Sequence, residues 1–67
     1  MFNYERMAEL IREKGIEQKT VAEAVGVSER AISVFVRGLK DPSVKVLVRI
    51  AHVLGVSAAE LIVEDGQ

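Results

Sequence analysis

The segment from Gln18 to Phe35 constrains the fold more than any other part of this chain, because its small residues are spaced for two helices that meet at a tight corner. Ala22 leaves room for a second helix to approach the first, and Gly26 can adopt the positive φ that ends a helix sharply. Ser28 can cap the helix that follows. The pattern therefore predicts a helix-turn-helix unit whose second helix presents one face outward.

Length and composition indicate a single small domain over residues 1–67, with the helix-turn-helix core at about 18–37 and a polar tail at 64–67. The chain has no cysteine and one histidine, so its 49% hydrophobic residues must stabilise it without a disulfide or a metal cluster. No apolar run approaches the roughly 20 residues of a membrane span, and no signal peptide is recognisable. We therefore expect a cytoplasmic protein with no metal, no cofactor and no membrane partner.

Helix start and stop signals predict an all-α, compact five-helix bundle. The expected helices run from the cap Asn3 to Gly15, from about Gln18 to Val25, from the cap Ser28 to about Arg37, from the cap Ser43 to Gly55, and over roughly Ala58 to Val63. The fourth helix carries an apolar stripe of Val44, Leu47, Ile50, Ala51 and Leu54. Ser57 followed by Glu60 is typical of a capping box at the start of the fifth helix.

Charge is distributed unevenly although the net charge is only −1. Residues 1–29 carry four basic and six acidic side chains, a balance of −2, and residues 53–67 carry three acidic ones. Residues 30–52 carry five basic and one acidic side chain, a balance of +4. The positive charge needed to bind phosphates therefore lies in the second half of the helix pair and just beyond it.

From Arg6 to Ile62 the chain resembles the lambda-repressor-like, Cro/C1-type helix-turn-helix family. The matching positions are Gln18, Ala22, Gly26-Val27-Ser28, Ile32-Ser33, Arg37-Gly38, Pro42-Ser43, Leu47, Ile50-Ala51 and Leu54-Gly55-Val56-Ser57. The resemblance implies a five-helix DNA-binding domain whose third helix enters the major groove of double-stranded DNA. It also implies a homodimer on a palindromic operator, and hence a transcriptional regulator, most simply a repressor of bacterial or phage type.

Four residues of the third helix are expected to read bases: Glu29, Arg30, Ser33 and Val34. Arg30 can pair with O6 and N7 of guanine, Glu29 can accept a hydrogen bond from a cytosine amino group, and Val34 can contact a thymine methyl group. The alternative for this face is a set of ordinary solvated helix residues.

Phosphate contacts are expected from residues that flank the reading helix. Gln18 and Lys19 open the second helix, where free N–H groups and the helix dipole favour an anion. The remaining candidates are Ser28, Arg37, Lys40 and Ser43. For the lysines, a purely solubilising role is an equally open interpretation.

Departures from the family pattern leave open an alternative function, a protein-interaction module on the same fold. Glu17 places a negative charge at the cap of the second helix, and Val34 with Val36 makes the reading helix unusually apolar. That side could dock a partner protein, and the chain could also be part of an antitoxin or of a longer regulator. The acidic row Glu5, Glu9 and Glu13 is interpreted as a solvated face that Arg6 and Arg12 partly neutralise.

No feature of the sequence predicts catalysis or a small-molecule substrate. His52, opposite the apolar stripe of the fourth helix, is interpreted as a surface histidine, because no partner for metal binding or general-base chemistry lies near it in sequence. Surplus apolar residues near the C-terminus predict a self-association patch, formed by Val46, Val53, Ile62 and Val63. Scattered surface valines are the alternative.

Overall fold

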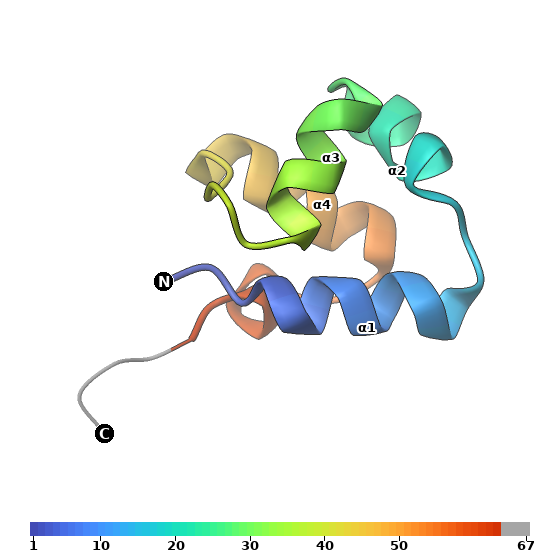
Figure 1. Cartoon of the computed structure of the whole chain (residues 1–67). Helices are drawn as coiled ribbons and strands as arrows, with labels where there is room; N and C mark the ends of the chain where they lie inside the picture. The colour runs from blue at the N-terminus through green and yellow to red at the C-terminus, as the bar shows by residue number, and fades with distance from the viewer. Residues whose placement is uncertain (64–67) are drawn as a thin grey trace.

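The structure, a computed structural model, describes residues 1–63 and confirms the all-α prediction (Figure 1). Its elements are the α-helices α1 (Tyr4–Lys14), α2 (Gln18–Val25), α3 (Glu29–Val36) and α4 (Val44–Leu54), followed by the 3-10 helix η1 (Ala58–Leu61). Within residues 1–63 there is no strand, only an isolated bridge between the two ends of the chain. The polar tail predicted at 64–67 lies outside the described residues.

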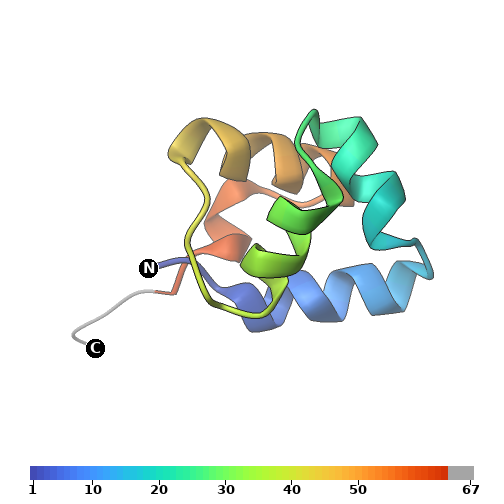
Figure 2. The ribbon, with the colours of Figure 1, turned by 45° about the horizontal axis from the view of Figure 1, so that its top comes forward.

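One apolar core joins all five elements. α2 packs against α3 and α4, α1 packs against α3 and η1, and α4 packs against η1. Figures 1 and 2 show α1 along one side of the molecule and α2 and α4 on the opposite side, with α3 running between them towards α1. The largest fully buried side chains come from every element: Met7, Val21, Ile32, Ile50, Leu54 and Leu61. This shared burial is the main source of stability in a domain without disulfides.

Three of the predicted caps form as side chain to backbone hydrogen bonds. The Asn3 Oδ1 atom accepts from the N–H of Arg6 at 3.0 Å, and the Ser28 hydroxyl oxygen accepts from the N–H of Ala31 at 3.0 Å. The Ser43 hydroxyl oxygen caps α4 in the same way, accepting from the N–H of Val46 at 3.3 Å. These bonds satisfy amide groups that the first turn of each helix leaves unpaired.

The corner between α2 and α3 is built around Ala22 and Gly26, as predicted. Gly26 has φ 91°, and its N–H donates to the Ala22 carbonyl at 2.8 Å. The N–H of Val27 donates to the same carbonyl at 3.1 Å, which turns the chain out of α2 at once. Ala22 itself is 2% exposed, so a larger side chain there would have no space against the neighbouring helices.

Two predictions about the second half of the chain are wrong. Val44 does not belong to the buried stripe of α4: it is 80% exposed, because it occupies the first helical position, where no other element packs over it. The capping box does not form either, since the Ser57 side chain makes no cap hydrogen bond. The Glu60 carboxylate instead pairs with Arg6, and the fifth helix is a single 3-10 turn that ends at Leu61 rather than Val63.

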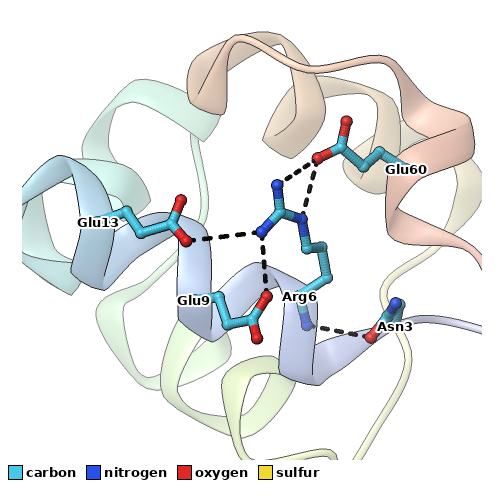
Figure 3. A network of polar contacts seen from close by, with 5 residues as sticks. All are labelled: Asn3, Arg6, Glu9, Glu13 and Glu60. Carbon is cyan, nitrogen blue, oxygen red and sulfur yellow. Dashed lines mark hydrogen bonds and ion pairs between the residues drawn. The ribbon is translucent and has the colours of Figure 1, made fainter.

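Arg6 is the centre of a polar cluster that joins α1 to η1 (Figure 3). Its guanidinium lies 2.7 Å from Glu60, 3.0 Å from Glu9 and 3.7 Å from Glu13. The hydrogen bond to Glu60, with a smaller effect from Glu9, raises the pKa of Arg6 further above its ordinary value. The predicted neutralisation of the acidic row thus occurs in part: Glu9 and Glu13 pair with Arg6, and within residues 1–63 neither Glu5 nor Arg12 forms an ion pair.

The two ends of the described chain pair with each other, which the sequence did not indicate. Phe2 and Ile62 form an antiparallel bridge, flanked by a hydrogen bond of 2.7 Å from the N–H of Asn3 to the Leu61 carbonyl. A second bond of 2.7 Å runs from the N–H of Val63 to the Met1 carbonyl. The bridge buries Phe2 against the core and, with the Arg6 cluster, fixes η1 on α1.

A stability prediction follows from the packing of Tyr4 on Gly38. Gly38 has φ 74°, and a Cβ atom there would lie 2.9 Å from the Tyr4 ring, whereas a Cβ at Gly15, with φ 66°, would meet nothing within 4 Å. Gly15→Ala should cost about 1–2 kcal/mol of unfolding free energy, from backbone strain alone. Gly38→Ala should cost measurably more in urea unfolding followed by circular dichroism. Introducing Tyr4→Ala should remove that excess; an excess that persists would contradict the packing argument.

Candidate nucleic-acid interface

Helix α3 is divided into a buried side and an outward side by its own periodicity. Ile32 is fully buried and Phe35 is 8% exposed, so both attach the helix to the core. Glu29 and Arg30 are exposed in the first turn, and Ser33 and Val34 are half-buried one turn later. Because Arg30 and Val34 are four residues apart, they lie on one side of the helix. The structure thus brings the four predicted base-reading residues to the outward part of α3.

Beside this face lies an open groove of about 640 Å³ between α3 and the start of α4. Its walls come from α3 and its cap on one side, and from the connecting loop and α4 on the other. They are formed by Ser28, Arg30, Ala31, Val34, Phe35, Lys40, Asp41, Pro42, Ser43 and Val46. Sequence reasoning missed this groove because it depends on how two helices are joined in space, although the buried Pro42 marks the loop that joins them.

The predicted phosphate-binding residues surround the outward side of α3. Ser28 and Ser43 are exposed N-caps of α3 and α4, and each hydroxyl still has its O–H to donate after accepting the cap bond. Gln18 is half-buried at the first position of α2, and Lys19 is exposed beside it. The first turn of each of these helices leaves backbone N–H groups without a partner inside the helix, as anion binding requires.

The basic residues around α3 are not neutralised by neighbouring acids. Arg30, Arg37 and Lys40 are exposed. In residues 1–63 every ion pair involves Arg6, on the side where α1 meets η1. These three cations therefore remain available for an external anion. Glu17 is exposed at the cap of α2 and makes no side-chain cap bond, so its negative charge persists next to Gln18.

The apolar residues of α3 are partly explained by packing. Val34 and Val36 are half-buried and contact the core, so they are less exposed than the sequence suggests. Val46 and Val53, proposed for self-association, are also half-buried against the core, and Val46 lines the groove. Ile62 and Val63 are 45% and 39% exposed.

His52 is exposed in the last turn of α4, as interpreted from the sequence. Among the described residues, no group of three metal-ligating side chains is gathered in one place. The helices of residues 1–63 include none with the length and apolar character to cross a membrane.

A steep α2–α3 corner, an outward α3 with polar and basic side chains, and capped helix starts around it define a helix-turn-helix DNA-binding domain. Residues 7–61 match the helix-turn-helix family HTH_3. A curated relative, the uncharacterised HTH-type transcriptional regulator y4dJ of Sinorhizobium fredii, is 42% identical over 55 residues, covering 82% of this chain and 71% of that protein.

Two solved DNA complexes have the same fold. The P22 c2 repressor in complex with a synthetic operator is 27% identical, with a TM-score of 0.86 over 92% of this chain and 94% of that one. SinR of Bacillus subtilis with DNA is 32% identical with a TM-score of 0.80, over 88% of this chain and 98% of that one. The chain belongs to the Cro/C1-type helix-turn-helix family, and it is a DNA-binding transcriptional regulator.

The cap of α3 gives a prediction with an internal control. Ser28→Ala removes the bond to the Ala31 N–H and should lower the unfolding free energy by about 1 kcal/mol. Ser57→Ala changes the equivalent cap position of η1, where no side-chain cap bond exists. This substitution should change the unfolding free energy by less than about 0.5 kcal/mol. Thermal and urea unfolding of both variants would measure the difference. Equal losses would show that the Ser28 bond does not stabilise α3.

Proposed function

We propose that the protein is a repressor of bacterial or phage type that acts in the cytoplasm and inserts α3 into the major groove of operator DNA. The observation that carries the proposal is the set of exposed, unpaired basic residues, Arg30, Arg37 and Lys40, around the outward side of α3. The fold shared with the operator-bound P22 c2 repressor supports it. No substrate or cofactor enters the proposal.

The proposed base contacts follow from the chemistry of the outward residues. Arg30 is exposed on the first turn and can place two N–H donors on O6 and N7 of guanine. Glu29 can accept from the amino group of cytosine, and the hydroxyl of Ser33 can donate or accept. Val34 offers an apolar surface next to Arg30, suited to a methyl group at the groove edge of a base.

Phosphate contacts on both sides of α3 would fix its position in the groove. The proposed residues are Gln18, Lys19, Ser28, Arg37, Lys40 and Ser43. Side chains of this kind hold the register of a protein on DNA and carry no sequence information themselves. The capped helix starts at Ser28 and Ser43 support this assignment.

Binding to a palindromic site as a homodimer is also part of the proposal. The exposed Ile62 and Val63 support a contact between two copies near the C-terminal end of the described chain, with Val46 and Val53 as further candidates. Two linked domains double the number of phosphate contacts, and binding of one half-site raises the local concentration at the other. That gain suits a chain whose net charge is −1.

DNA binding itself is tested by titrating random duplex DNA at low and moderate salt. Binding should weaken steeply with salt, because each neutralised phosphate releases counterions. Absence of binding at low salt would overturn the proposal and favour the protein-interaction module, with the side of Val34 and Val36 as its contact surface.

Arg30→Ala and Lys40→Ala should have different effects on DNA affinity. Loss of Arg30 should reduce discrimination at one base pair by about 1–3 kcal/mol, because the bidentate guanine contact disappears. Loss of Lys40 should weaken all sequences alike and reduce the slope of log Kd against log salt by about 1. Lys14→Ala is the matched control, because Lys14 lies beside Gly55 at the far end of α4 and should change neither quantity. Equal effects of Arg30 and Lys40 on all sequences would contradict a reading role for Arg30.

Ile62→Glu should weaken self-association measured by analytical ultracentrifugation. Burying an unpaired carboxylate in an apolar contact should raise the dimer dissociation constant at least about tenfold. Val48→Glu is the control, because Val48 is 50% exposed in α4 beside Arg49 and His52 rather than beside the C-terminal bridge. A larger effect of the Val48 substitution than of the Ile62 substitution would contradict this proposal and indicate that the dimer contact lies on α4.

A further inference from the structure

The groove between α3 and α4 combines an apolar wall with a basic rim. Ala31 and Val34 are half-buried and, with Pro42 and Val46, give the groove an apolar surface. Arg30 and Lys40 line the same groove and are exposed. Such a surface requires an apolar partner on the DNA, although nearly everything that base pairs present in the major groove is polar.

The apolar feature of a base in the major groove is the carbon at position 5 of a pyrimidine, when it carries a methyl group. Val34 lies four residues, or about 6 Å along the helix axis, beyond Arg30 on the same side of α3. Base pairs are spaced about 3.4 Å apart along the duplex. When Arg30 pairs with a guanine, the apolar wall therefore lies over a base one or two pairs away.

The neighbouring acid selects which methylated pyrimidine fits. Glu29 is exposed in the first turn of α3, between Ser28 and Arg30 in the sequence, at the edge of the groove rather than in its lining. Thymine presents a carbonyl oxygen next to its methyl group, which a carboxylate would repel, whereas cytosine presents an amino donor. A carboxylate and a guanidinium in the first turn of α3, with an apolar wall one turn further along, together match a methylated cytosine close to a guanine.

Building on the proposed reading of DNA by α3, we propose that this groove is a methylation-sensing subsite whose occupant is the methyl group of a 5-methylcytosine near the guanine read by Arg30. Binding should then increase when that cytosine is methylated. The gain should be about fourfold for one half-site and roughly fifteenfold for two, as expected for removing one methyl group from water at each.

The test uses the whole chain and a duplex selected from a random DNA pool. Each pyrimidine of the half-site is replaced in turn by cytosine, 5-methylcytosine, thymine or uracil, and Kd is measured by fluorescence anisotropy. One position, within two base pairs of the guanine that Arg30→Ala ceases to discriminate, should bind 5-methylcytosine about fourfold more tightly than cytosine and more tightly than thymine.

A pair of isosteric variants assigns the effect to the groove. Val34→Thr replaces one methyl group of the wall by a hydroxyl, and should reduce the ratio of 5-methylcytosine to cytosine affinity towards one. Val48→Thr makes the same change on the exposed side of α4 and should leave the ratio intact. Circular dichroism of both variants checks folding, and the wild-type comparison of the four bases decides the question if Val34→Thr is unfolded.

The outcomes separate this inference from the proposed function. Equal affinity for cytosine and 5-methylcytosine at every position, with specific binding intact, would overturn the methylation site alone. Tighter binding of thymine than of 5-methylcytosine would assign the groove to thymine and remove the role of Glu29. If no sequence is selected from the pool, the proposed reading of DNA fails and the methylation site fails with it.

Discussion

The close approach of α2 and α3 at Ala22 is the constraint on which the functional surface depends. The Ala22 side chain is almost completely buried, and its carbonyl accepts from both Gly26 and Val27. One residue thus sets how near the second helix comes and where the first helix ends. Once that corner is fixed, burial of Ile32 determines the rotation of α3 about its axis, and so determines that Arg30 points outward.

Helix α3 is stable because of its inner side, not because of its own length. A helix of eight residues is too short to be stable alone in water, so its order comes from packing and from the Ser28 cap. Ile32 and Phe35 provide the packing, while Val34 is half-buried and contributes to both the core and the groove. A reading helix held in this way presents its polar side chains at fixed positions, which limits the entropy lost on binding.

Features within a few residues of one another could be predicted from the sequence, and features that join distant segments could not. The Asn3, Ser28 and Ser43 caps were predictable because each bond spans three residues. The Ser57 capping box failed because the Glu60 N–H donates to the Ser57 carbonyl in the 3-10 turn, while the Glu60 carboxylate has a partner 54 residues away, the guanidinium of Arg6. The pairing of the chain ends and the groove beside α3 are likewise products of tertiary packing, so periodicity and spacing contain no signal for either.

A net charge of −1 is compatible with DNA binding because part of the acidic charge is gathered away from α3. Glu9, Glu13 and Glu60 gather around Arg6 where α1 meets η1 (Figure 3). Electrostatic interactions between exposed charges fade over about 8 Å at physiological salt. The electrostatic interaction of a DNA backbone with α3 is therefore determined by the charges close to α3 rather than by the net charge of the protein. Glu17 beside the start of α2, and Asp41 in the groove beside α3, are negative charges near this surface that lower the affinity that the basic residues provide.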